Sequence, residues 1–182
     1  MINHIGTKPI ITSRLQLRRF ILNDTNDAFE KWASSIDSIF WEPPHKTLCE
    51  TAKMIDTYVE NYRNSNWYMW AIEYENKLVG LACGNEIDEN TKSICLGYCI
   101  AKTHWNKGIA TEASKALINY FFNAGFSRVF SHHNPNNPSS GRVMQKCGMK
   151  FEGLISGGSM FAGEVCDCLQ YAIVKSDCHK NI

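Results

Sequence analysis

The segment with the clearest chemistry runs from His104 to Glu112 and reads His-Trp-Asn-Lys-Gly-Ile-Ala-Thr-Glu. It stands directly before apolar residues at helical spacing, so it should form the turn that opens a helix. Gly108 and the small Ala110 let backbone N–H groups converge on an anion, and the helix dipole adds positive potential there. The segment therefore predicts a phosphate or pyrophosphate site. It has neither the Walker A nor the Gly-x-Gly-x-x-Gly pattern, which disfavours nucleotide hydrolysis and dinucleotide redox chemistry.

A second segment, Asn137-Pro138-Ser139-Ser140, follows an expected strand that ends in the pair His132-His133. Its Asn and Pro are typical of a helix N-cap and a first helical position, so a short helix should begin here. Capping by itself explains Asn137, and contact with a ligand is the alternative. Histidine suits proton shuttling near neutral pH, although a histidine pair at a strand end is often only solvated.

The cysteines raise the question of disulfides or a metal site, and there are eight of them: Cys49, Cys83, Cys95, Cys99, Cys147, Cys166, Cys168 and Cys178. A chain that can bury an ordinary core does not need disulfides, so we expect reduced thiols, most of them acting as small apolar residues. Neither Cys166-Asp167-Cys168 nor the histidine pair has the spacing of a structural zinc site. We predict no metal, with a thiol or zinc protein as an alternative.

The composition is that of one globular domain spanning residues 1–182, with a core from about 12 to 175. Hydrophobic residues make up 44% and charged residues 20%, which argues against disorder. Nineteen Lys and Arg against eighteen Asp and Glu leave a net charge of +1, which disfavours nucleic acid or a membrane as partner. Without a signal peptide or an apolar run of spanning length, we expect a cytoplasmic protein.

Hydrophobic periodicity assigns the elements that position these segments. In chain order it predicts a strand at 14–18, helices at 23–36 and 47–64, strands at 68–74, 78–87 and 93–100, a helix from 109, a strand at 128–132, a short helix at 137–147, and strands at 149–155 and 166–174. This order is α+β, a mixed and mostly antiparallel sheet of about six to seven strands with about four helices. Ligands favour the point where such a sheet splits.

Several motifs occur in a fixed order along nearly the whole chain: Thr12-Ser13-Arg14-Leu15-Gln16-Leu17-Arg18, Trp70-Ala71-Ile72, Leu78-Val79-Gly80, Gly97-Tyr98, Trp105 to Ala113, Asn137 to Met149, and Glu152-Gly153. In this order they resemble the GNAT N-acetyltransferases, and within them the Rim-type branch that acetylates ribosomal-protein N-termini. The resemblance implies the GNAT fold, an α/β/α sandwich whose sheet is splayed in the middle. It also implies an enzyme, an acetyltransferase.

The cofactor implied by the resemblance is acetyl-CoA. Its pyrophosphate would bind the N–H groups of the turn, its pantetheine arm would lie between the strands that end at Ile100 and His132, and an indole would pack beside it. The implied cofactor-binding residues are Cys99, Ile100, Ala101, Trp105, Asn106, Lys107, Gly108, Ile109, Ala110, Thr111 and Asn137. Pairing of the arm with exposed backbone would be strand addition by a ligand.

Acetyl transfer needs a neutral amine, a donor for the developing oxyanion and a proton for the departing thiolate. In related enzymes a hydroxyl at the position of Ser140 lies near the coenzyme sulfur, which implies a general acid; a local hydrogen bond within the helix is the alternative. The oxyanion donor is expected to be a backbone N–H around Cys99. No covalent enzyme intermediate is required.

The general base is left open by the sequence. Many relatives carry an acidic residue two positions before the Gly-Tyr pair, and Cys95 stands there instead. Glu86, His132 and His133 are the possible substitutes. A weak base suffices for an α-amino group, whose pKa is about 7.7–8.0, but not for lysine at about 10.4. The loss of the carboxylate therefore favours a protein N-terminus as acceptor.

We therefore predict direct, acetyl-CoA-dependent acetylation of an amine, most consistent with a protein or peptide N-terminus. The loop Trp41-Glu42-Pro43-Pro44 lies between the first two expected helices, where relatives receive the acceptor, so the resemblance implies that this loop sets specificity. A small amine, such as a polyamine or an aminoglycoside-like antibiotic, is the alternative acceptor. A non-catalytic acetyl-CoA sensor is the alternative from another class, and a homodimer is possible.

Overall fold

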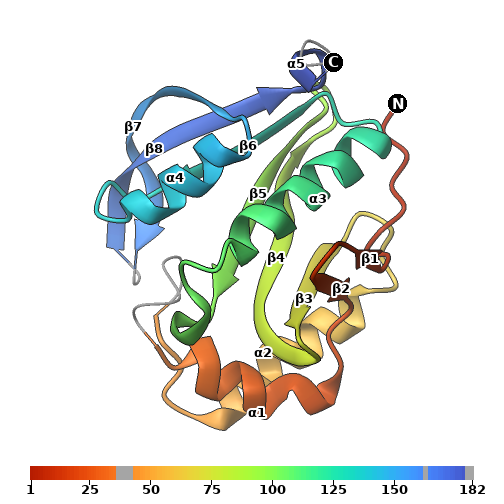
Figure 1. Ribbon diagram of the computed structural model, residues 1–182, viewed down its shortest axis with the longest axis vertical. Helices are drawn as coiled ribbons and strands as arrows, with labels where there is room; N and C mark the ends of the chain where they lie inside the picture. Colours follow the sequence, from red (N-terminus) through yellow and green to blue (C-terminus); the bar gives the residue numbers. More distant parts are fainter. Residues whose placement is uncertain (36–42, 162–163, 179–182) are drawn as a thin grey trace.

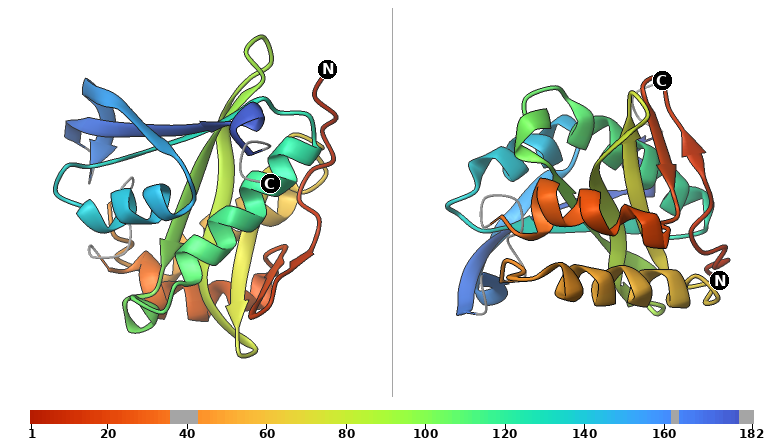
Figure 2. Two further views of the ribbon diagram at one scale, coloured as in Figure 1. Left: turned by 45° about the horizontal axis from the view of Figure 1, so that its top comes forward. Right: turned by 90° about the horizontal axis from the view of Figure 1, so that it is seen from below.

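A twisted sheet covered by helices on both faces forms the molecule (Figure 1). The computed structural model describes residues 1–35, 43–161 and 164–178. Within these residues the sheet has eight strands in the order β1-β2-β3-β4-β5-β6-β8-β7. Helices α3 and α4 lie on one face, and α1 and α2 lie on the other (Figure 2). The predicted α+β sandwich is therefore confirmed.

The strands are β1 (Ile10–Ile11), β2 (Leu15–Arg18), β3 (Tyr68–Tyr74), β4 (Lys77–Asp88), β5 (Ser93–Ile100), β6 (Arg128–His133), β7 (Lys150–Phe161) and β8 (Glu164–Val174). The α-helices are α1 (Thr25–Ala28), α2 (Leu48–Asn61), α3 (Ile109–Asn123), α4 (Pro138–Lys146) and α5 (Lys175–Cys178). Short 3₁₀ turns cover Leu22–Asp24 and Lys102–His104, and a π-helical turn covers Phe29–Ala33.

All seven strands of the predicted order are present, and β1 adds an eighth by pairing Ile10 with Leu17. The last hairpin is longer than the sequence suggested, because β7 continues beyond Ile155 and pairs Ser159 with Cys166. An irregularity between Ile155 and Ser159 takes up the glycines, with Gly157 at φ 62°. Residues predicted to form a turn are thus a bulge inside a strand.

The first helix differs from its prediction. Instead of one helix from residue 23, the chain forms a 3₁₀ turn, a single α turn and a π-helical turn. The Asp24 side chain makes no cap hydrogen bond to α1. Its carboxylate instead accepts from the Ile21 N–H at 2.9 Å, in the capping box of the 3₁₀ turn, and binds Arg18 at 2.7 and 2.8 Å. Ile36, the predicted end, lies outside the described residues.

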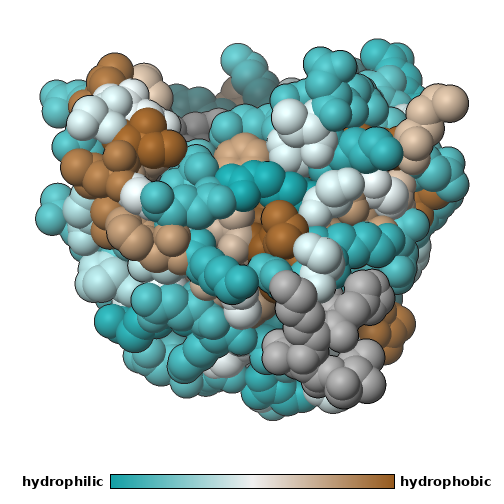
Figure 3. Space-filling view, turned by 90° about the horizontal axis from the view of Figure 1, so that it is seen from above, coloured by the Kyte–Doolittle hydropathy of each residue, from teal (hydrophilic) through white to brown (hydrophobic). Residues whose placement is uncertain are grey.

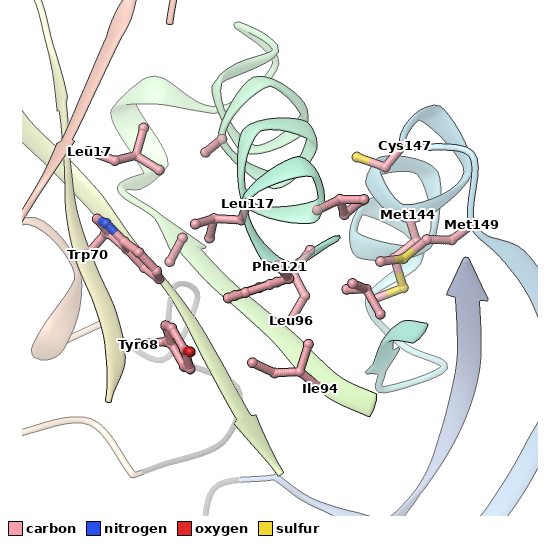
Figure 4. Packing of buried hydrophobic residues seen from close by; sticks show 14 of the residues in the cluster. Leu17, Tyr68, Trp70, Ile94, Leu96, Leu117, Phe121, Met144, Cys147 and Met149 are labelled. Atoms are coloured by element: carbon pink, nitrogen blue, oxygen red, sulfur yellow. The ribbon is translucent and has the colours of Figure 1, made fainter. Parts of the chain in front are cut away.

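The main core lies between α3 and the sheet (Figure 4). Four residues of α3 that recur every fourth position are buried there: Ile109, Ala113, Leu117 and Phe121. The Phe121 ring meets that of Tyr68 edge to face at 5.5 Å. A smaller core on the other face joins Trp32 and Ile55 with Cys99 of β5. Because β5 packs into a core on each face, its orientation in the sheet is fixed.

The sheet splits between β5 and β6. These strands pair in parallel only from Ser93 to Cys95, opposite Arg128 to Phe130. Just beyond, the Ser131 hydroxyl donates to the Leu96 carbonyl at 2.7 Å, and β6 then continues beside β8. Figures 1 and 2 show the two halves of the sheet diverging there. The C-terminal half of β5 is therefore left with an edge that β6 does not cover.

On the face seen in Figure 3, hydrophobic residues gather most densely on the left side, where β7 and β8 lie. The exposed apolar side chains of these strands are Phe151, Leu154, Ile155, Met160 and Val165. Within the described ranges, no helix is long and apolar enough to cross a membrane.

Candidate active site

A cleft of about 400 Å³ opens where β5, the start of α3 and α4 converge. Its walls come from three segments that are far apart in the sequence: Tyr98, Ile100, His104, Trp105, Asn106, Gly108, Ile109, Ala110, Thr111, Asn137, Ser139, Ser140, Arg142, Val143 and Lys146. The open edge of β5 and the predicted anion-binding turn thus line the same cavity.

The turn before α3 has the backbone of an anion site. Asn106 and Gly108 both lie in the left-handed region, at φ 60° and φ 77°, and α3 begins directly afterwards at Ile109. The first N–H groups of a helix have no partner within it, and here they belong to a helix of fifteen residues whose dipole favours negative charge. Gly108 is suited to its position because a left-handed backbone is strained for residues with a Cβ.

Contacts with the loop before β2 hold this turn in place. The Glu112 carboxylate in the first turn of α3 accepts hydrogen bonds from Thr12 Oγ1 at 2.6 Å and Arg14 Nε at 2.8 Å. Arg14 Nη1 also donates to the Lys107 carbonyl at 3.1 Å. Burial would raise the pKa of the Glu112 carboxyl, but the hydrogen bonds from Thr12 and Arg14 lower it below its ordinary value. The carboxylate therefore stays ionised and ties the turn to β2.

The open edge of β5 can be identified from its pairing with β4. Ala101 N donates to the Val79 carbonyl at 2.8 Å, so Ala101 directs its backbone toward β4. Alternate residues of a strand bond to opposite neighbours, so Cys99 also faces β4, whereas Tyr98 and Ile100 face the split. The Ile100 carbonyl on that edge accepts from Trp105 Nε1 at 2.7 Å, which sets the indole against the cleft.

Helix α4 contributes Ser140 to the cleft. Asn137 caps this helix by accepting from Ser140 N at 3.4 Å, and its Nδ2 donates to Ser140 Oγ at 3.2 Å. The hydroxyl accepts in this bond, so its own proton remains available to a group in the cleft. Tyr98 fixes the same residue from the other side, because its hydroxyl donates to the Ser140 carbonyl at 3.0 Å.

The residues considered as a base divide into two places. Glu86 and His132 lie together with Cys95, with all their donor atoms within 4.8 Å of one another. His133 lies elsewhere: it is buried beside Gly141 of α4, stacks on Tyr171, and donates its Nδ1 proton to the Asn134 carbonyl at 2.8 Å.

The GNAT acetyltransferase domain model matches residues 14–150, three quarters of the chain. The chain belongs to the GNAT acetyltransferase family. The chain is 27% identical over 172 residues to the uncharacterised N-acetyltransferase YoaA of Bacillus subtilis. The match covers 92% of this chain and 97% of YoaA. The chain is also 27% identical over 119 residues to the ribosomal-protein-serine acetyltransferase of Escherichia coli, covering 65% and 66%.

Solved GNAT structures have the same fold. The ribosomal L7/L12 α-N-protein acetyltransferase RimL, in a structure described as a complex with coenzyme A, superposes with a TM-score of 0.80 at 19% identity and covers 92% of this chain and 98% of its own. The GNAT fold and the N-acetyltransferase class expected from the sequence motifs are thus confirmed.

Most of the residues that the GNAT resemblance assigned to the cofactor line one cleft, and so does Ser140. Three of the predicted residues are placed differently from the rest. The Cys99 side chain packs into the second core on the opposite face, the Ala101 N–H bonds to β4, and Lys107 lies in the turn before α3, where its carbonyl accepts from Arg14. For Cys99 and Ala101 the physical reason is strand alternation, which puts Ile100 and not its two neighbours at the split. Trp41 and Glu42 of the expected acceptor loop lie outside the described residues.

Several site features of this GNAT protein were missed by the sequence reasoning. Tyr98 was noted only as part of a motif, yet it lines the cleft and fixes Ser140. Arg142 and Lys146 add cationic groups to the same wall at a spacing of one helical turn on α4, a signal that was readable in the sequence. The meeting of Glu86 with Cys95 and His132 had no such signal, because the three residues come from three strands.

Proposed function

We propose that the protein transfers the acetyl group of acetyl-CoA directly to the N-terminal α-amino group of a protein. The observation that carries this proposal is the single cleft that joins the start of α3, the open edge of β5 and the Ser140 hydroxyl. Acetyl-CoA is a thioester that carries phosphates and an arm with amide groups. Such a ligand needs an anion-binding turn, a strand edge that is open to hydrogen bonding and a proton donor, and this cavity combines all three.

The cofactor is assigned to this cleft by chemistry. The pyrophosphate takes the N–H groups from Asn106 to Thr111 at the start of α3, with Arg142 and Lys146 as additional cations. The amide groups of the pantetheine arm pair with the backbone at Tyr98 and Ile100, as an added strand would. The RimL structure, which is a complex with coenzyme A, supports this choice of ligand.

The transfer step needs one proton moved at each end. The amine nitrogen attacks the thioester carbonyl, its C–N bond forms while the C–S bond breaks, and the Ser140 hydroxyl supplies a proton to the departing thiolate. A backbone N–H on the open edge of β5 donates to the oxyanion; Cys99 is not that donor, because its N–H faces β4.

The amine approaches from the other face of the sheet. Ile94 and Leu96 of β5 pack into the core under α3, so the alternating Cys95 points to the opposite face, where Glu86 and His132 meet it. We assign these two side chains to accept the proton that the amine loses. His133 is buried under α4, away from these two side chains, so we exclude it from this role.

The acceptor class rests on the relatives and on the site. The Escherichia coli relative is named for a ribosomal protein, which supports a protein acceptor. An α-amino group, with a pKa of about 7.7–8.0, needs only a modest base such as the one assigned here.

Titration calorimetry and turnover test this function together. Wild type should bind acetyl-CoA and acetylate peptides at their N-termini, whereas Gly108→Trp should lose binding while circular dichroism shows it folded. Ser140→Ala is the matched control: it should bind acetyl-CoA but turn over slowly. Turnover with polyamines or aminoglycosides alone would replace the acceptor class, binding without turnover on any amine would indicate a sensor, and no binding by folded wild type would overturn the proposal.

A further inference from the structure

Three strands bring a thiol, an imidazole and a carboxylate together beside the split of the sheet. Cys95 Sγ of β5 lies 3.9 Å from His132 Nδ1 of β6, and the Glu86 carboxylate of β4 lies within 4.8 Å of both. Cys95 is 4% exposed, His132 is half-buried and Glu86 is exposed. The cluster therefore has a buried floor and a side open to solvent.

The backbone of β4 is distorted where it carries Glu86. Pairing with β5 is interrupted between Asn85 and Asp88, and Glu86 has a left-handed backbone at φ 47°. A residue with a Cβ seldom adopts this conformation, and bulges often redirect one side chain. The effect here is that the carboxylate of Glu86, although exposed, lies beside the Cys95 thiol.

These donors match the preferences of zinc. Thiolate, imidazole and carboxylate are its usual protein ligands, and three of them with one open position is the arrangement of a reactive zinc site. Zn–S and Zn–N bonds of about 2.3 and about 2.0 Å at a tetrahedral angle separate S from N by about 3.5 Å. The observed 3.9 Å needs only a small side-chain adjustment, and the exposed Glu86 can rotate to follow.

We propose that Glu86, Cys95 and His132 form a binding site for a divalent zinc-class cation. On binding, the Cys95 thiol loses its proton to solvent and the thiolate takes the metal, with water in the fourth position. Cys168 of β8, also buried, interacts electrostatically with both Glu86 and Cys95 and offers a further thiol beside the site.

The site has a regulatory consequence, which rests on the proposed function. Glu86 and His132 cannot hold a metal and accept the proton of an amine at the same time. Zinc at this place therefore inhibits acetyl transfer without occupying the acetyl-CoA cleft on the other face. The metal site itself does not depend on the reaction, because binding is measured on the protein alone.

The test is titration of chelator-treated protein with Zn²⁺ and with Co²⁺, whose thiolate complexes absorb in the near ultraviolet. We expect one metal per chain and a thiolate-to-cobalt band. Cys95→Ala should remove the band and weaken Zn²⁺ binding at least about tenfold, and His132→Asn should weaken binding to a similar extent. Cys49→Ser, which removes an exposed thiol on α2, is the matched control and should change neither.

The outcomes separate this site from the proposed function. A band that persists in folded Cys95→Ala, or wild type that binds no stoichiometric zinc, overturns the metal site whatever the acetylation assay shows. If Cys95→Ala does not fold, the decision passes to His132→Asn, whose binding must be weakened. Metal binding with no acetylation of any amine keeps the metal site and removes the proposed function.

Discussion

Asn137 holds Ser140 by both its backbone and its hydroxyl. The amide oxygen accepts from Ser140 N at 3.4 Å, and the amide nitrogen donates to Ser140 Oγ at 3.2 Å. One side chain therefore caps α4 and orients the group that faces the cleft, so helix stability and hydroxyl position are coupled.

Substitutions at Asn137 separate these two roles. Asn137→Ala removes both bonds and should cost about 1 kcal/mol of stability as well as turnover. Asn137→Asp keeps an acceptor for the helix N–H but cannot donate to Oγ, so it should retain stability and still lower kcat. Urea unfolding and steady-state kinetics on each variant check this. Equal kcat for wild type and Asn137→Asp would show that the hydroxyl orientation does not contribute to catalysis.

Removal of the Ser140 hydroxyl tests its chemical role. Because a general acid typically contributes about 10²-fold or more, Ser140→Ala should lower kcat by that order while leaving the affinity for acetyl-CoA near that of wild type. Calorimetry supplies the affinity and a thiol-release assay the rate. A fall in affinity with kcat unchanged would instead place the hydroxyl in cofactor binding.

The clamp between Arg14 and Glu112 should support cofactor binding from outside the cleft. Glu112→Gln keeps the size of the side chain but removes its charge, so the turn loosens and acetyl-CoA affinity should fall by about 1 kcal/mol, or about fivefold. Calorimetry measures the change. Glu152→Gln breaks a comparable ion pair with Arg128 between β6 and β7 and should leave the affinity unchanged. Identical losses in the two variants would point to a general effect of stability.

The same carboxylate should contribute to acid sensitivity. The pKa of Glu112 is lowered in the folded state, so its contribution to stability is complete above the ordinary value of 4.5 and is lost as the pH falls through the lower, folded value. Stability measured by urea unfolding between pH 7 and pH 3 should fall less steeply below pH 4.5 in Glu112→Gln than in wild type. Superimposable profiles would contradict this assignment.

Gly141 and His133 should be coupled energetically. A Cβ added at Gly141 would stand 2.6 Å from His133 Nε2, so Gly141→Ala should destabilise the protein by about 1–3 kcal/mol through overpacking. His133→Ala makes room, and the double variant should be less destabilised than the sum of the two single changes. Thermal or urea unfolding of wild type, the two single variants and the double variant completes the double-mutant cycle. Additive changes in the free energy of unfolding would mean that the His133 ring moves aside freely.

Local sequence patterns predicted the order of strands and the main helices. In the site they predicted the turn before α3 and the start of α4. The apolar residues of α3 at every fourth position, the Asn137 cap and the glycine turn depend on contacts within a few residues, and they form as expected. The expected helix from residue 23 shows the limit of such patterns: the Asp24 carboxylate closes the capping box of a 3₁₀ turn and also binds Arg18, a contact that depends on where β2 lies against β3.

The tertiary structure decided the rest. Which edge of β5 faces the split, and hence whether Ile100 or Cys99 meets the cleft, follows from pairing with β4 and from the cores on both faces. The cluster of Glu86, Cys95 and His132 depends on three strands: the distorted end of β4, and β5 and β6 at the point where their pairing ends. Periodicity within a strand establishes which residues share a face, but register and strand order are set by long-range packing of the whole chain, which no short segment contains.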